Sequence, residues 1–313
     1  MPLPDFEISS QHLQSWIEEC FSFARRGEVA SYIPALRSVP KGILGVAICD
    51  LNGEIVEAGD SDYNFTLQSI SKVMTLLLAL EDHGPYAVFK RVGMEPTGDP
   101  FNSIVKLETL KPSKPLNPMI NAGAIAVCDL VNGRTADEKF QRIVDFVKRL
   151  ANTSEIILDS DVYNSEMDTG HRNRALAYFL KDVDVIRGDV EDTLEIYYRQ
   201  CALKVTCRDL AFIGAALAND GQVPGNGEQI VKPEYCRIAK AFMVTCGLYD
   251  GSGEFAIKVG IPAKSGVSGG ILASVPHEFG IGVIGPALDD KGNSIAGVKL
   301  LERISNHWNL SIF

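Results

Sequence analysis

The sequence predicts an α+β fold in which an antiparallel sheet, flanked by helices, lies beside a mostly helical subdomain. Strand-like patterns occur near both ends of the chain and helix-like patterns fill its middle, an order that favours segregated strands and helices. With 313 residues, of which 46% are hydrophobic, the chain is long enough to bury one large core. We therefore expect residues 1–313 to form one domain. Its sheet subdomain would come from roughly residues 1–68 and 250–313, its helical subdomain from roughly residues 69–249, and an active site would lie in the cleft between them.

The N-terminal part of the chain predicts one helix and one hairpin. Residues 10–26 carry apolar side chains at helical spacing, and a serine precedes them as a possible N-cap. Residues 42–50 and 54–59 are two short apolar runs joined by Asn52 and Gly53, a pair typical of tight hairpin turns. These two runs are the first strands of the expected sheet.

The middle of the chain predicts helices. The first is strongly apolar and precedes Gly84 and Pro85, which favour the end of a helix. Thr206 and Asp209 are spaced as a capping box with an acidic last position, which predicts the start of a later helix. Helical length and pattern occur at residues 69–83, 136–151, 192–203, 206–219 and 233–246.

The C-terminal part of the chain returns to strands. We expect strands at residues 255–259, 270–275 and 279–284. A Gly-Asn pair at residues 292–293 predicts a turn, and residues 296–308 predict a closing helix. The sheet would therefore combine strands from both ends of the chain.

The acidic composition argues against several classes of partner. Thirty lysines and arginines against 40 aspartates and glutamates give a formal net charge of −10, which would repel nucleic acid and an anionic membrane surface. The longest apolar stretch, residues 73–80, is roughly a third of a membrane span. The first ten residues lack the basic and apolar regions of an export signal. Seven cysteines without CxxC spacing fit a reducing cytoplasm, where we expect this protein, and the scattered histidines form no metal-binding motif.

The strongest chemical signal is the spacing of Ser69 and Lys72. Three residues apart at the start of a helix, both side chains lie on one face, where a lysine of lowered pKa could deprotonate the serine. The apolar residues that follow would bury the pair and lower the pKa of the lysine. The motif alone leaves open an equal alternative, a helix-capping serine with a surface lysine. The same spacing from Ser38 to Lys41 contains Pro40 and precedes no apolar helix, so we expect a loop there.

A second signal is the run Lys264, Ser265 and Gly266. A Lys-[Ser/Thr]-Gly element that occurs together with an SxxK serine is the combination described for penicillin-recognising enzymes, and this sequence contains both. Gly266 would let the strand approach the substrate, a nearby backbone N–H would complete an oxyanion hole, and Lys264 would help to lower the pKa of Lys72. A glycine-rich hairpin loop is the alternative. The Ser-Asp-Asn element of those enzymes is absent from the sequence, which argues against a β-lactamase or transpeptidase.

Three further segments, residues 117–124, 165–174 and 246–253, are dense in polar side chains. Each alone is more readily interpreted as a turn with capping residues. Together with QSISK and AKSGVSGG, the segments NPMINAGA, SEMDTGHRNRA and CGLYDGSGEFA resemble the serine-dependent glutaminase family over nearly the whole chain. The resemblance implies a fold similar to β-lactamases and penicillin-binding proteins. It also implies hydrolysis of L-glutamine to L-glutamate and ammonia through a serine acyl-enzyme, with no metal or organic cofactor.

Within that resemblance, Ser69 matches the nucleophile and Lys72 the general base, while Tyr249 is a candidate acid-base partner. Glu166 would bind the α-ammonium group of glutamine, and Asn173 with tyrosine hydroxyls would bind its α-carboxylate. The substrate-binding positions that the resemblance implies are Tyr32, Ser69, Asn121, Glu166, Asn173, Tyr197, Tyr249 and Val267.

The resemblance also implies an oxyanion hole, an oligomer and one departure from the family pattern. The backbone N–H groups of Ser69 and Val267 match the family's oxyanion hole. Because the family is commonly dimeric or tetrameric, we expect a homodimer or homotetramer whose partner is L-glutamine, with no nucleic acid or membrane. His171 stands where the family usually has aspartate and could alter the charge of the pocket. A β-lactam hydrolase and a degenerate member that only binds an amino acid stay open as alternatives.

Overall fold

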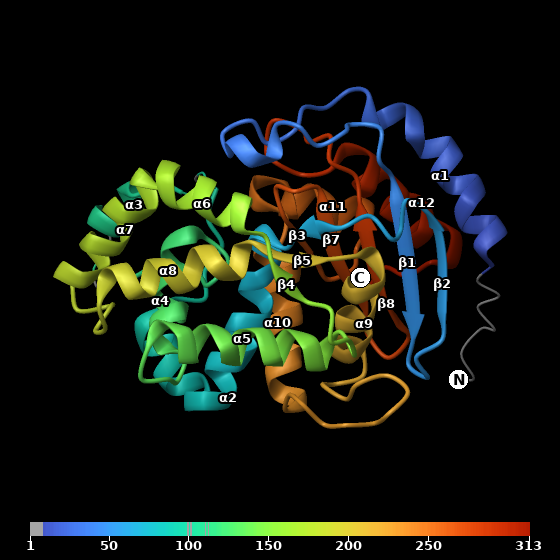
Figure 1. Ribbon diagram of the computed structural model, residues 1–313. Helices are drawn as coiled ribbons and strands as arrows, with labels where there is room; N and C mark the ends of the chain where they lie inside the picture. Colours follow the sequence, from blue (N-terminus) through green and yellow to red (C-terminus); the bar gives the residue numbers. More distant parts are fainter. Residues whose placement is uncertain (1–8, 99, 101, 110, 112) are drawn as a thin grey trace.

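The main sheet has five antiparallel strands in the order β2-β1-β8-β7-β6. The computed structural model describes residues 9–98, 100, 102–109, 111 and 113–313, so the first eight residues, where we expect no export signal, lie outside the described part. The strands are β1 (Gly45–Asp50), β2 (Ile55–Gly59), β6 (Ala263–Ser265), β7 (Gly270–Val275) and β8 (Phe279–Ile284). Two of them precede the helices of the middle segment and three follow (Figure 1), so the predicted α+β class is confirmed.

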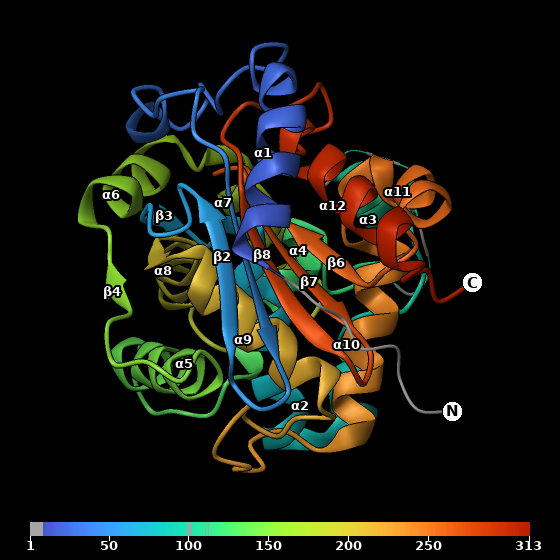
Figure 2. The same cartoon turned by 90° about the vertical axis from the view of Figure 1, so that its right-hand side faces the viewer.

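Helices cover both faces of this sheet. On one face, α1 (Ser10–Ala24) packs beside α12 (Ile295–Trp308), as Figure 2 shows. The rings of Trp16 and Trp308 are 5.3 Å apart there. On the other face lies α9 (Cys207–Ala218). Apolar side chains therefore point both ways along each central strand, which makes those strands continuous apolar runs in sequence.

Glycines in β8 allow α9 to approach closely. Phe279, Ile281 and Val283 point into the core beneath α1 and α12, whereas Gly280 and Gly282 alternate with them. A Cβ on either glycine would overlap the backbone of α9. The helix can rest directly on the sheet only because these positions have no side chain.

Most of the remaining helices form a second group beside the sheet, shown at the left of Figure 1. A small sheet, in the order β3-β5-β4, joins this group to the main sheet. The helices of the group are α2 (Ser71–Arg91), α3 (Val105–Thr109), α4 (Asn121–Leu130), α5 (Ala136–Leu150), α6 (Ser160–Thr169), α7 (His171–Asp182), α8 (Val190–Cys201) and α10 (Pro233–Cys246). The short helix α11 (Ser252–Lys258) lies instead near α12, and its Phe255 belongs to the core beneath α1 and α12. The shorter elements are β3 (Phe65–Thr66), β4 (Ile157–Leu158), β5 (Leu203–Val205) and the 3-10 turns η1 (Pro34–Leu36), η2 (Gln68–Ile70) and η3 (Tyr249–Gly251). Among the described residues, none of the helices is both long and apolar enough to cross a membrane.

Most element predictions are confirmed, and the capping box at Thr206 and Asp209 is present at the start of α9. The strand predicted at residues 255–259 is wrong, because this segment lies in and just after the helix α11. Phe255 and Val259, four residues apart, are buried, while Ile257 between them is 87% exposed, which is a helical and not a strand pattern.

The predicted end of the first long helix near Gly84 and Pro85 is confirmed. The element α2 runs from Ser71 to Arg91, but Gly84 has a non-helical φ of 73° and ψ of 167°, so two helices meet there at a kink. The first of them begins at Ser71 and not at Ser69, because the turn η2 precedes it.

Candidate active site

Ser69 lies in η2, immediately ahead of α2. Its neighbour Gln68 has a φ of 49°, a left-handed conformation that costs a non-glycine residue about 1 kcal/mol. The buried Gln68 side chain offsets this cost, because its Nε2 donates to Glu166 Oε1 at 3.0 Å and to Thr66 Oγ1 at 3.3 Å. The residue that caps α2 is Ile70, so the interpretation of Ser69 as a simple helix cap is wrong.

Lys72 is 1% exposed, which excludes the alternative of a surface lysine. Its Nζ donates to Asn121 Oδ1 at 2.8 Å and to the Met119 carbonyl at 3.1 Å. Burial lowers the pKa of the ammonium group to about 8, although the negative charge of Glu166 opposes this shift. No direct hydrogen bond joins Lys72 to Ser69 within the described residues.

The contact to Asn121 continues towards α7. Asn121 is the first residue of α4, and its Nδ2 donates to Asn173 Oδ1 at 3.0 Å. Asn173 lies in the first turn of α7. A chain of hydrogen bonds thus connects Lys72, Asn121 and Asn173, which the sequence places far apart.

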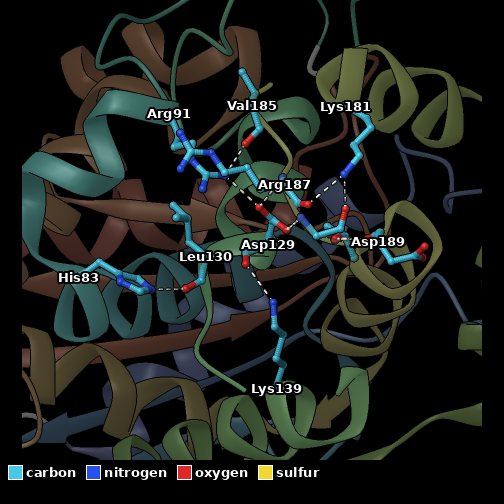
Figure 3. Close-up of polar contacts among 11 residues, drawn as sticks. His83, Arg91, Asp129, Leu130, Lys139, Lys181, Val185, Arg187 and Asp189 are labelled. Carbon is cyan, nitrogen blue, oxygen red and sulfur yellow. Dashed lines mark hydrogen bonds and ion pairs between the residues drawn. The ribbon is translucent and has the colours of Figure 1, made fainter. Parts of the chain in front are cut away.

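Asp129 fixes the other end of α4, as Figure 3 shows. Its carboxylate pairs with Arg91 at 2.9 Å and accepts from the backbone N–H groups of Arg187 at 3.0 Å and Gly188 at 2.8 Å. The side chains of Arg91 and Asp129 are 15% and 4% exposed. This buried cluster ties α2, α4 and the segment before α8 together, and so it holds the helix that carries Asn121.

Glu166 is a buried carboxylate on α6. Burial raises its pKa to about 7, while the hydrogen bond from Gln68 and the charge of Lys72 act in the opposite direction. The group is therefore poised to become fully ionised when a cation binds beside it.

Tyr249 lies in η3, with a left-handed φ of 51°. Burial raises the pKa of the phenol far above its usual value, and the nearby hydroxyls of Ser69 and Ser265 oppose this rise only in part. The phenol is therefore protonated at neutral pH. Lys264 Nζ lies 4.6 Å from the centre of the Tyr249 ring.

Lys264 is fully buried, and its Nζ donates to the carbonyls of Gly247 at 2.9 Å and Ser265 at 2.6 Å. Burial first, and the charge of Lys72 second, lower the pKa of Lys264 well below its usual value. Burial is the largest cause of the lowered pKa at both lysines. Lys264 is not among the groups that shift the pKa of Lys72, so our expectation that it lowers that pKa is not confirmed.

Gly266 brings the end of β6 against the turn that holds Ser69. A Cβ at this position would lie 2.6 Å from the Leu67 carbonyl oxygen and 3.3 Å from the Gln68 Cβ. We expected this glycine to let the strand approach the substrate, and in the structure the segment that it lets β6 approach is the turn η2 with the residue before it. Val267 follows in a tight turn, in which the Gly269 N–H donates to the Gly266 carbonyl at 2.9 Å.

A cavity of about 210 Å³ opens where these segments meet. Ser69, Glu166, Asn121, Asn173, Tyr32, Tyr197 and Val267 all line it. Lys72 and Tyr249 contact lining residues without lining the cavity themselves. His171 is exposed and is not among the residues that line the cavity, although its neighbours Gly170 and Arg172 are.

The lining also contains residues that we did not predict. Gln68, Cys201, Asn102 and Arg172 contribute to it, with Ile33, Thr169 and Gly170. Arg172 lies within a polar segment that we singled out, whereas nothing in the local sequence of Cys201 or Asn102 indicates a site. Gln68 precedes Ser69 directly, and that adjacency was the available signal.

The Glutaminase family profile matches residues 27–313. The chain belongs to the glutaminase family. A glutaminase from Shouchella clausii is 55% identical over 305 residues, which cover 97% of this chain and 99% of the relative. The crystal structure of a Bacillus glutaminase in 4.3 M NaCl matches with a TM-score of 0.90 and 43% identity, covering 97% of this chain and 99% of the other.

A third match is the covalent complex of a Bacillus subtilis glutaminase with 5-oxo-L-norleucine, formed by reaction with 6-diazo-5-oxo-L-norleucine. Its TM-score is 0.88 at 40% identity, over 97% of this chain and 99% of the other. These neighbours confirm the β-lactamase-like fold expected for this glutaminase. They also support glutaminase activity, with glutamine as a substrate consistent with the family.

Proposed function

We propose that this glutaminase hydrolyses L-glutamine through an acyl-enzyme on Ser69. The observation that carries the proposal is the convergence of Ser69, Glu166 and Asn173 on one cavity of about 210 Å³. A hydroxyl nucleophile, a carboxylate and an amide there correspond to the three groups of glutamine that must be bound or attacked. These are its side-chain amide, its α-ammonium and its α-carboxylate.

Acylation begins with the neutral amine of Lys72, which takes the proton of the Ser69 hydroxyl. Ser69 Oγ bonds to the side-chain amide carbon, and the carbonyl oxygen becomes an oxyanion. The backbone N–H groups of Ser69 and Val267 stabilise that oxyanion. Burial supports this role of Lys72, because a pKa of about 8 leaves a useful fraction of neutral amine near neutral pH.

The carbon–nitrogen bond then breaks, and the proton that Lys72 took from Ser69 passes through Tyr249, which contacts Ser69, to the departing nitrogen. Ammonia leaves, and Lys72 is again a neutral amine. A water molecule next attacks the ester carbonyl, Lys72 takes its proton, and Ser69 leaves as the hydroxyl. The product is L-glutamate. The raised pKa of Tyr249 keeps the phenol protonated and so excludes a resting phenolate base.

Recognition of free glutamine rests on both ends of its backbone. Glu166 pairs with the α-ammonium, while Asn173, Tyr32 and Tyr197 provide hydrogen-bond donors for the α-carboxylate. Asparagine has one methylene fewer, so it could not satisfy these groups and present its amide to Ser69 together. The Bacillus subtilis relative supports the proposal, because the 5-oxo group of its covalent ligand stands where glutamine carries its amide carbonyl.

We further propose a homodimer or homotetramer in the cytoplasm. Tyr86, Ile257 and Phe313 are 84%, 87% and 78% exposed, and contact with another copy would remove these apolar side chains from water. All seven cysteines are free thiols, as a reducing compartment would keep them. The two groups of elements described above would act as subdomains of one catalytic domain.

Ammonia release by the purified protein tests the proposed activity. We expect release from L-glutamine at least about 100-fold above that from L-asparagine, since an unmatched polar group is discriminated strongly. Ser69→Ala should abolish release and leave the melting temperature within a few degrees of the wild type. Equal release from both amides, or wild-type turnover by Ser69→Ala, would contradict the proposal.

A further inference from the structure

Asn293 links two segments of the catalytic site from outside the cavity. Its Oδ1 accepts a hydrogen bond from Ser265 Oγ at 2.7 Å, and its Nδ2 donates to the Leu248 carbonyl at 3.1 Å. The side chain is 3% exposed, and its backbone N–H is held by Asp289 Oδ1 at 2.9 Å. One amide group therefore bridges the end of β6 and the residue before Tyr249.

The two hydrogen bonds fix the orientation of this amide. The Leu248 carbonyl can only accept, so the NH₂ group of Asn293 must face it and the oxygen must face Ser265. Ser265 must then donate to Asn293, which leaves the lone pairs of its hydroxyl for the nearby Tyr249 phenol. Without Asn293, the Ser265 hydroxyl could turn to the Gly247 carbonyl, 3.4 Å away.

The residue before Asn293 packs against the same groups. Gly292 has a φ of 92°, and a Cβ there would lie 3.6 Å from the Tyr249 ring and 3.5 Å from Val267 Cγ1. Tyr249 itself is in a left-handed turn whose preceding carbonyl, that of Leu248, accepts from both Asn293 and the Gly251 N–H at 2.9 Å. The loop thus supports the strained turn that carries the phenol.

We propose that Asn293 is a positioning residue that holds Ser265 and the Tyr249 turn in register, so that the phenol lies correctly against Ser69. The inference deepens the function proposed above and rests on it. Asn293 touches neither substrate nor the reacting atoms, and it acts through Tyr249.

The test measures kcat and KM for L-glutamine in Asn293→Ala. We expect kcat to fall by about tenfold or more and KM to stay within about twofold, because the substrate contacts are untouched. The matched control is Ser294→Ala. Ser294 is the next residue, is fully buried and caps α12 by accepting from the Gly297 N–H at 3.0 Å. The control should lower the melting temperature but leave kcat within about twofold.

A double mutant with Tyr249→Phe distinguishes a positioning role of Asn293 from a general loss of structure. In a Tyr249→Phe background, which already lacks the phenol, Asn293→Ala should lower kcat by less than about twofold more. If Asn293→Ala does not fold, Ser265→Ala replaces it with the same expected pattern. An unchanged kcat, or an equal loss in both backgrounds, overturns the positioning role. Turnover in Ser69→Ala tests the proposed function separately. The proposed function would therefore survive a result that overturns the positioning role of Asn293.

Discussion

Two buried ionisable side chains, Lys72 and Glu166, set the pH range in which the site can act. Burial lowers the pKa of Lys72 to about 8 and raises that of Glu166 to about 7. In the proposed mechanism Lys72 works as the neutral amine and Glu166 as the carboxylate. Both groups reach their working form by losing a proton, so both titrations favour activity as the pH rises.

We expect kcat/KM for L-glutamine to rise with pH, with an ascending limb between about pH 7 and 8, since kcat/KM reports the free enzyme. The measurement is a pH profile of kcat/KM in a constant-ionic-strength buffer. In the pH profile of kcat, measured at saturating glutamine, the rise caused by ionisation of Glu166 should occur at lower pH, because a bound ammonium stabilises the carboxylate. A profile that is flat from about pH 6 to 9 would rule out control by these two groups.

Glu166→Gln should weaken glutamine binding more than turnover. Removing the charge that pairs with the α-ammonium should raise KM by roughly tenfold to 100-fold, the range of a charged hydrogen bond. Steady-state kinetics give both constants. Asp161→Asn, the same chemical change on an exposed residue of α6, is the control and should change neither. An unchanged KM in Glu166→Gln would remove Glu166 from the ammonium site.

At the scale of elements, local signals predict those helices and strands whose sequences carry them. Pro233 marks the first residue of α10, and Thr206 with Asp209 marks the start of α9. By contrast, α4 was missed because residues 121–128 are buried on all sides and show no periodicity. Gln68 escaped prediction because its partner Glu166 lies 98 residues away, a distance that no local pattern spans.

Gly266→Ala should separate β6 from the turn that carries Ser69. The added Cβ would lie 2.6 Å from the Leu67 carbonyl oxygen, so one of the two segments must move. We expect a stability loss of about 1–3 kcal/mol in chemical denaturation, and a kcat at least about tenfold lower. Gly253→Ala is the control, because nothing lies within 4 Å of its added Cβ and a helix favours alanine. Wild-type kcat in Gly266→Ala would show that this close contact is dispensable.

Asp129→Asn should destabilise the fold through the cluster of Figure 3. The change leaves Arg91, which is 15% exposed, without its charged partner, and we expect a loss of about 3 kcal/mol in urea unfolding. The control is Asp137→Asn, which breaks the ion pair with Arg199. The side chain of Asp137 is 84% exposed, so its loss should cost less than about 1 kcal/mol. Equal effects of the two changes would mean that the Asp129 cluster does not hold α4.

At the scale of the whole molecule, the cavity exists only when distant segments meet. Tyr32 comes from the N-terminal part of the chain, Asn121, Glu166 and Asn173 come from three helices, and Val267 follows β6. The sequence resemblance identifies these residues one by one. Their distances, their burial and the pKa values that follow could be obtained only from the folded chain, because each depends on neighbours from another segment.

Covalent labelling of Ser69 tests the central claim most directly. The purified protein is treated with 6-diazo-5-oxo-L-norleucine, digested and analysed by mass spectrometry. We predict one 5-oxonorleucine unit per chain, on the peptide that contains Ser69, and none in Ser69→Ala. Cys201 also lines the cavity, but burial raises the pKa of its thiol well above the usual value and makes it a poor nucleophile. Label on Cys201, or undiminished labelling of Ser69→Ala, would contradict the assignment of Ser69 as the nucleophile.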